Sequence, residues 1–222
     1  VRARHPELTV ETAVAVDVSS FPLARATKDA ALVVVGSRGY SAQLKTAALG
    51  GTADAVATHA HGPVAVIPEF ASANLDVTAP DDRPVVVGVD DSPEALGAIQ
   101  FAAAEAARRG VPLVGLHAWR AWPWLTETLV GWSAGYTDVG AGLDAMVRDL
   151  VAPYLAEGQA FESRVVGGHP AVQLVEASKD ASLLVVGSRG RGGFAGLLLG
   201  STSRETLRLA RCPVVVIRRR PE

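Results

Sequence analysis

Short apolar runs alternate with amphipathic stretches along most of the chain, and this alternation predicts strands and helices in turn. Runs rich in valine, leucine and isoleucine predict buried strands at Pro84–Val89, Val111–Trp119, Phe161–Val166, Ser182–Val186 and Val214–Ile217. The stretches between them predict helices at 92–109, Asp144–Leu155, 170–178 and Ser201–Ala210. Strands that alternate with helices in this way form a parallel sheet covered by helices on both faces, so we expect an α/β fold.

Capping residues mark three of the helix limits. Ser92, followed by a proline and a glutamate, predicts a helix start, and Gly110 predicts the end of the same helix. Thr202 and Glu205 have the spacing of a capping box, which predicts a second helix start. The free backbone N–H groups and the dipole of such a start favour an anion.

An internal repeat relates the two ends of the chain. Asp29–Pro68 matches Asp180–Arg218, with an offset of 151 at Gly36 and of 150 at Pro63. The pattern of the second copy can be followed back to Pro84, whereas the first copy lacks the same upstream part. We therefore expect a C-terminal half of a first domain at residues 1–68, a linker at 69–83 and a complete second domain at 84–222. These two domains are called the first repeat and the second repeat below.

The composition argues against several classes of protein. No apolar run approaches the roughly 20 residues that cross a bilayer, and a formal charge of −2 with mixed signs gives no basic face for nucleic acid. A single cysteine, Cys212, cannot form an internal disulfide, which agrees with a cytoplasmic protein. We interpret His59 and His61 as a surface pair rather than a metal site, and the arginines at 218–220 as a solvated tail.

Six glycines lie in the segment Val185–Ser203, between a predicted strand and a predicted helix. Glycine allows close approach of backbone and ligand, and hydroxyl groups donate to phosphate oxygens, so this loop predicts a phosphate site. The residues that would face the phosphates are Gly187, Gly190, Gly200, Ser201 and Thr202. The alternative is a tight turn that binds nothing. A P-loop is excluded because no lysine precedes Ser201. A dinucleotide-binding motif is also excluded, because no acidic residue follows at the distance that its fingerprint requires.

The G-x2-G-x9-G-[ST] spacing of these residues resembles the universal stress protein family. The sequences VVVGVDDS at Val85–Ser92 and VVVI at Val214–Ile217 share in the resemblance, which covers nearly the whole chain. It implies an open five-stranded parallel sheet of order 3-2-1-4-5, here in tandem with an incomplete first copy. It also implies ATP as the ligand of the ATP-binding members, and pairing of domains through their last strands, as in family dimers.

The resemblance also implies roles for single residues. Asp90 would contact the adenosine, Ala118 would line the adenine pocket, and the loop residues would hold the ribose and the phosphates. Asp90 has a second interpretation, as a cap of the helix start at Ser92. The first repeat has one extra loop residue and Gly51 in place of the serine, so we expect no ATP there.

The function that these residues favour is a non-catalytic ATP-binding stress-response or regulatory protein. The alternatives are a slow ATPase or phosphotransferase, for which the loop offers no positioned base, and an interaction module without ligand. We also expect self-association, through the last strands or through the strand at Ala31–Val35, whose edge would be left unpaired.

Overall fold

The computed structural model describes residues 5–16, 20–38, 49–69, 81–119, 133–192 and 198–218, and of 133–138 the backbone alone. Its strands are β1 (Val33–Gly36), β2 (Val64–Ile67), β3 (Val85–Gly88), β4 (Leu113–Trp119), β5 (Phe161–Gly167), β6 (Leu183–Gly187) and β7 (Val214–Ile217). Its helices are α1 (Ser20–Ala26), α2 (Gly51–His59), α4 (Pro93–Arg109), α6 (Ser133–Val151), α7 (Pro170–Ala177) and α8 (Ser201–Leu209), with a short 3-10 helix at Ala152–Tyr154. No helix within these ranges is long and apolar enough to span a membrane.

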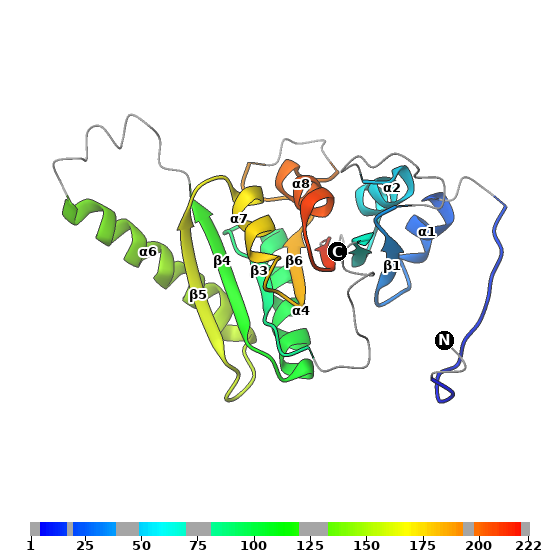
Figure 1. Cartoon of the computed structure of the whole chain (residues 1–222), viewed down its shortest axis with the longest axis horizontal. Coiled ribbons are helices and arrows are strands. Elements are labelled where there is room, and N and C mark those ends of the chain that lie inside the picture. Colours follow the sequence, from blue (N-terminus) through cyan, green and yellow to red (C-terminus); the bar gives the residue numbers. More distant parts are fainter. Residues whose placement is uncertain are drawn as a thin grey trace.

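All seven strands belong to one sheet, in the order β1-β2-β7-β6-β3-β4-β5 (Figure 1). Strands β5-β4-β3-β6-β7 are parallel and follow the 3-2-1-4-5 order that the family resemblance implies. Strand β2 continues the sheet by pairing with β7 in antiparallel direction, and β1 pairs with β2 in parallel. The repeats therefore share one mixed, mostly parallel sheet, because their last strands pair with each other as the family resemblance implies.

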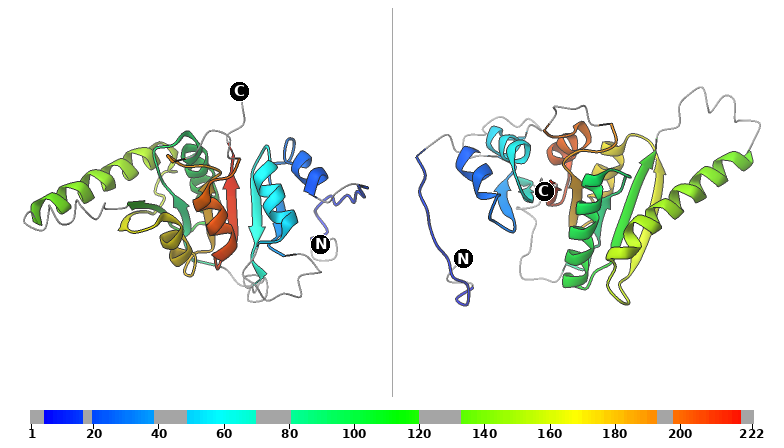
Figure 2. Two further views of the ribbon diagram at one scale, coloured as in Figure 1. Left: turned by 90° about the horizontal axis from the view of Figure 1, so that it is seen from above. Right: turned by 180° about the vertical axis from the view of Figure 1, so that it is seen from behind.

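The two faces of the sheet are covered by different helices. Helices α1, α2, α7 and α8 cover one face, and α4 and α6 cover the other, as the opposed views of Figures 1 and 2 show. The side chains beneath them form two apolar clusters, one on each side of the sheet. Alternate residues of a strand point to opposite faces, so valine runs such as β7 are buried on both sides.

Local sequence signals set the limits of α4 as expected. The backbone N–H of Ala95 donates to the side-chain oxygen of Ser92, 3.2 Å away, and Pro93 occupies the first helical position. Gly110 ends the helix in the left-handed conformation, with φ 70°. The predicted helix at Asp144–Leu155 in fact begins earlier, at Ser133, and its last turn tightens into the 3-10 helix that contains a proline.

The repeat seen in the sequence has a counterpart in the hydrogen bonds. The hydroxyl of Thr27 accepts from the backbone N–H of His61 at 2.7 Å, and the hydroxyl of Ser178 accepts from Arg211 at 2.8 Å. Each hydroxyl also donates to a carbonyl three residues earlier in the chain, at 2.6 Å. The same bond therefore ties the end of α1 to the end of α2, and the end of α7 to the end of α8.

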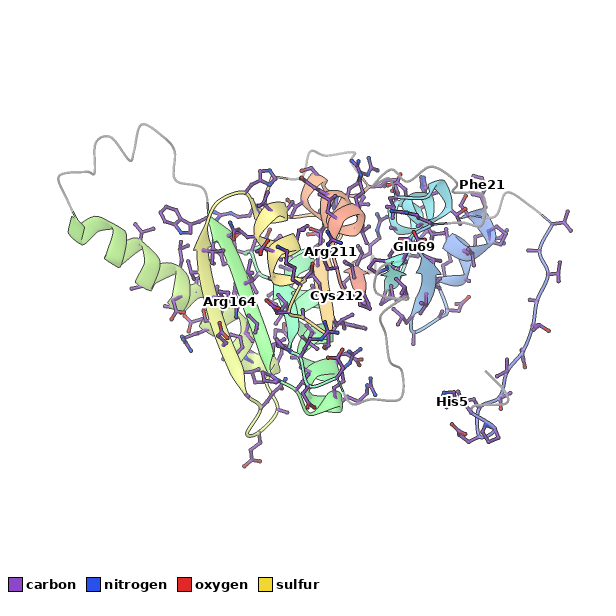
Figure 3. The ribbon with its side chains drawn as sticks, viewed as in Figure 1. His5, Phe21, Glu69, Arg164, Arg211 and Cys212 are labelled. Carbon is purple, nitrogen blue, oxygen red and sulfur yellow. The ribbon has the colours of Figure 1, made fainter. Side chains whose placement is uncertain are left out.

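The first repeat leaves apolar surface uncovered. Val34 in β1 is 57% exposed, whereas its equivalent in β6, Val185, is fully buried beneath α4. Among the described strands, β1 pairs with β2 alone, so the expectation of an unpaired edge there is confirmed. Residues 5–16 lie apart from the sheet in Figures 1 and 2, and Val14 and Val16 are almost fully exposed. Phe21 lies on the outer side of α1 (Figure 3).

Candidate functional site

The predicted site residues gather where three neighbouring strands end. Asp90 follows β3, Ala118 lies near the end of β4, and Gly187 ends β6. Strand β3 is hydrogen-bonded to both β4 and β6, and all three run in the same direction. Helix α8, whose first residues are Ser201 and Thr202, begins beside the same edge of the sheet. This edge, formed by the carboxyl ends of parallel strands, is where open α/β sheets bind ligands.

Asp90 is the centre of a small hydrogen-bond network. Its Oδ1 accepts from the backbone N–H of Ser92 at 3.0 Å and from the Ser92 hydroxyl. Its Oδ2 accepts from the backbone N–H of Arg191 at 3.2 Å, on the far side of the glycine loop. Asp90 therefore supports the start of α4, in agreement with its interpretation as a cap of that helix. It also holds the glycine loop, a role that the sequence did not predict.

Two of the glycines are required by close approach inside the protein. A Cβ on Gly187 would lie 3.1 Å from the carbonyl carbon of Glu94, in the first turn of α4. A Cβ on Gly190 would lie 2.5 Å from Oδ2 of Asp90. Among the described residues only Gly110, Gly158 and Gly168 have positive φ, so Gly187 and Gly190 are needed for space and not for a left-handed backbone.

Gly200 is different, because the described residues around it leave room for a side chain. Its nearest neighbours would be the carbonyl oxygen of Ser188 at 3.4 Å and Cα of Arg189 at 3.5 Å, which are ordinary contacts. Its backbone is extended, with φ −68° and ψ 155°, a conformation open to any residue. The part of the fold that the structure describes therefore gives no reason for glycine at this position.

Backbone and hydroxyl groups hold the glycine loop at both ends. The N–H of Ser188 donates to the carbonyl of Ile217 at 2.7 Å, and the N–H of Gly200 donates to the carbonyl of Ser188 at 2.7 Å. The hydroxyl of Ser203 donates to the carbonyl of Gly187 at 2.7 Å. Ser203 was missed in the sequence, although its position three residues after Gly200 places it on the inner side of the first turn.

The predicted capping box at the start of α8 is wrong. Gly200 is the N-cap, no side chain caps it, and Thr202 already lies inside the first turn. The carbonyl of Thr202 accepts from the hydroxyl of Thr206 at 2.8 Å. Because the first N–H groups of a helix have no intrahelical acceptor, those of Ser201 and Thr202 can serve a ligand without displacing a cap.

Ala118 lies opposite Asp90 across the β3–β4 pair. The last paired residues are Gly88 and Leu116, and Asp90 and Ala118 each lie two positions further on. His117 is buried, and its Nδ1 lies 2.8 Å from the carbonyl oxygen of Val89, so it joins the ends of the two strands. Of the four tryptophans after β3, only Trp119 belongs to the described residues.

Three arginines lie around the loop. Arg189 forms an ion pair with Glu94 at 2.5 Å, and Arg191 forms one with Asp91 at 2.8 Å. Arg218 is not part of a solvated tail, as the sequence suggested. Its guanidinium donates to the carbonyl of Thr58 in α2 at 2.8 Å and to the carbonyl of Leu198 in the loop. Burial, and secondly the charge of Arg189, lower the pKa of Arg218. Arg219 and Arg220 lie outside the described residues.

The first repeat shares the closure of this loop but not its chemistry. Gly50 donates to the carbonyl of Ser37 at 2.8 Å, and Ser37 donates to that of Ile67 at 2.9 Å, as in the second repeat. Arg38 pairs at 2.7 Å with Glu69, which is labelled in Figure 3. Gly51 stands where the second repeat has the serine at 201.

Residues with other chemistry do not assemble near the loop in the described part of the chain. Burial raises the pKa of the Cys212 thiol to about 12, so this cysteine stays protonated in the interior, where Figure 3 shows it. No group of three or more histidine, cysteine, aspartate or glutamate residues in the described ranges is placed to hold a metal ion. His59 ends α2, and His61 lies beyond the helix; both are exposed.

Comparisons with known proteins agree with this architecture. The sequence profile of the Universal stress protein family matches residues 1–68 and 83–218. Universal stress protein Rv1996 of Mycobacterium tuberculosis is 39% identical over 202 residues, which are 88% of this chain and 61% of that protein. The chain thus spans less than two thirds of the length of this relative.

A solved structure with a TM-score above 0.5 gives the same result for the fold. A universal stress protein from Archaeoglobus fulgidus matches with a TM-score of 0.59 at 23% identity, over 88% of this chain and 63% of that one. Another from the same organism was solved in complex with dAMP. It matches with a TM-score of 0.44 at 26% identity, over 61% of this chain and 97% of that one. On the profile match, which covers most of its length, the chain belongs to the universal stress protein family.

Proposed function

We propose that the protein binds ATP through the second repeat and acts as a non-catalytic stress-response regulator. The observation that carries the proposal is Gly200. It occupies the N-cap of α8, where nothing among the described residues requires glycine and where serine, aspartate or asparagine would serve a helix start at least as well. A ligand that approaches the backbone closely gives a reason for the missing side chain.

The charges around the loop favour an anionic ligand. The side chains of Arg189 and Arg191 are 45% and 67% exposed, and each can turn from its carboxylate partner toward a phosphate. The N–H groups at the start of α8 point their dipoles toward the same region. Together these groups suit a polyphosphate better than a neutral molecule.

The adenosine end of the proposed site rests on Asp90 and Ala118. Their positions side by side, at the ends of β3 and β4, leave them on the same strand edge as the glycine loop. The roles of the two residues, a contact to the adenosine and a lining of the adenine pocket, come from the family resemblance. The network of Asp90 supports the assignment, since it ties that carboxylate to the loop through Arg191.

The proposal of a non-catalytic role rests on the carboxylates. General-base catalysis needs a carboxylate or imidazole free to accept a proton from the attacking group. Both oxygens of Asp90 already accept hydrogen bonds, and Asp91 and Glu94 pair with arginines. A slow ATPase or phosphotransferase would have to release one of these carboxylates first.

Calorimetric titration of ATP into wild type and Gly200→Val tests the proposed site. We expect one site per chain in the wild type, and no binding in the variant because a branched side chain fills the space at the start of α8. The matched control is Gly51→Val at the start of α2, where an added Cβ meets nothing within 4 Å. This control should bind ATP as the wild type does.

Three outcomes of the same experiment would contradict the proposal. Two equivalent sites would place ATP in the first repeat as well. Equal loss of ATP binding in Gly200→Val and Gly51→Val would show that binding does not depend on Gly200. Absence of any heat with ATP would favour the interaction module without ligand. Release of phosphate from ATP, measured in parallel on wild type and Gly200→Val, would favour the enzyme if only the wild type shows it.

A further inference from the structure

The contact between the two repeats has local two-fold symmetry. In the antiparallel pair β2–β7, Ala65 lies opposite Val215, and these two residues are equivalent at the repeat offset of 150. On either side, Val64 lies opposite Val216 and Val66 lies opposite Val214. If the two repeats exchanged places, equivalent positions would therefore pair in the same way. The two-fold axis passes between Ala65 and Val215.

A charged pair lies on the same axis. Oδ1 of Asp54 is 3.1 Å from Nε of Arg204, and each residue is the fourth of its helix, α2 and α8 respectively. Two equivalent residues related by a two-fold axis can contact each other only near that axis. In a pairing of two identical repeats, each of these residues would therefore meet its own copy.

We propose that Asp54 and Arg204 make this sheet edge select the other repeat of the same chain and reject a second copy of either repeat. Pairing of two second repeats, one from each of two chains, would place Arg204 against Arg204. Pairing of two first repeats would place Asp54 against Asp54. Like charges in contact weaken an interface, while the observed pair strengthens it.

A neighbouring contact adds to the selection. The Arg204 guanidinium also reaches the hydroxyl of Thr58, at 3.4 Å, and the equivalent of Thr58 in the second repeat is Arg208. Two second repeats would thus bring Arg204 of each toward Arg208 of the other. Arg218 donates to the carbonyl of Thr58. The residue equivalent to Arg218 in the first repeat is Pro68, which has no hydrogen-bond donor, so a pair of two first repeats would lack this bond.

The strands themselves cannot supply this discrimination. The residues that flank the axis on β2 and β7 are all valines, and they pack in the same apolar cluster. Their burial therefore stabilises any combination of repeats to a similar extent. The selection has to come from the polar residues above the strands.

Hydrogen exchange of the β2 amides in the full chain tests the pair. Asp54→Arg and Arg204→Asp should each lower the protection of Val64–Ile67 by about two- to fivefold, the range of exposed ion pairs. The double variant with both substitutions should recover most of the protection. The control is Asp144→Arg on α6, which breaks a similar exposed pair with Arg148 and should leave β2 unchanged. Unchanged protection in the single variants, or no recovery in the double variant, would overturn the proposal.

Sedimentation of the wild type, Arg204→Ala and Asp54→Arg tests rejection of a second copy. Arg204→Ala removes the clash between two second repeats, since position 204 then carries no charge to face its own copy or Arg208 of the other chain. We expect Arg204→Ala to dimerise at lower concentration than either the wild type or Asp54→Arg, in which that clash remains. Association at the β1 edge is common to all three proteins and cancels in the comparison. Equal dimerisation of the three proteins would show that the charges do not exclude a second copy.

Discussion

Substitution of Asp90 by alanine should both destabilise the protein and weaken ATP binding. The carboxylate accepts two backbone N–H groups and one hydroxyl, and it joins the start of α4 to the glycine loop. Hydrogen bonds to a charged group contribute about 1.5–3 kcal/mol, and solvent replaces part of this because Asp90 is only half-buried. We expect a loss of about 2 kcal/mol without nucleotide, which lowers Tm by about 4–8 °C in a chain of this size.

Thermal melting with and without ATP separates the two effects. At about 100 times its Kd, ATP should stabilise the wild type by about 2.7 kcal/mol, and Asp90→Ala should gain far less. Asp91→Ala is the matched control, because Asp91 is exposed and its ion pair with Arg191 contributes at most about 1 kcal/mol. If Asp90→Ala melts like the wild type and shows the full shift with ATP, neither the network nor the binding role assigned to Asp90 is correct.

Three further changes test parts of the fold outside the site. The pKa of Glu105 is lowered to about 2, chiefly by hydrogen bonds from Arg108, so this carboxylate stabilises the protein above its ordinary pKa of 4.5. That stabilisation, about 1 kcal/mol after solvent screening, should be lost as the pH falls from about 4.5 to 2. Glu105→Gln has no carboxylate to protonate, so this loss of stability should be missing from its acid titration, followed by circular dichroism. Val34→Lys should reduce self-association through the β1 edge, measured by light scattering, because a charge would cover exposed apolar surface. Gly62→Ala should lower the hydrogen-exchange protection of the first repeat, since a Cβ there would overlap the carbonyl oxygen of Thr27.

Each of these changes has a control or an outcome that contradicts it. An unchanged acid transition in Glu105→Gln would show that the arginines do not stabilise that carboxylate. Val172→Lys changes a valine of similar exposure, 56%, on the outer side of α7 and should leave self-association unaltered. Equal scattering from the two lysine variants would exclude the β1 edge as the contact. Gly51→Ala adds a Cβ in open space and should keep the protection that Gly62→Ala loses.

The parts of the fold that the sequence predicted well depend on neighbours in the chain. Ser92 and Gly110 set the limits of α4 through bonds that span at most four residues. The strand order of the second repeat, in contrast, came from the family resemblance and not from the strands' own pattern. The capping box predicted at Thr202 is wrong for a local reason. A T-x-x-E match does not specify where the helix begins, and here the helix begins one residue before the threonine.

The sequence predicted that the glycine loop allows close approach of a ligand, and the structure shows close approach within the protein itself. Sequence reasoning assigned Gly187 and Gly190 to the ligand, whereas each is also required by the protein, against α4 and against Asp90. Spacing alone cannot separate the two reasons, because both leave a glycine at the same position. The distances do separate them. Among the three glycines predicted to bind the ligand, they leave Gly200 as the one that the described residues do not explain.

Last-strand pairing had two possible partners in the sequence, the other repeat or another chain. In the structure β2 and β7 pair with each other and each has a second neighbour, β1 and β6, so self-association through the last strands would require the repeats to separate. Local pattern could not decide this, since the bond from Arg218 to Thr58 joins residues 160 positions apart. The offset between the two copies of the repeat could have indicated that the last strands pair within the chain. Once antiparallel pairing of equivalent strands is assumed, equivalent residues near the axis must meet. A position with opposite charges in the two copies, as at Asp54 and Arg204, then favours pairing within the chain.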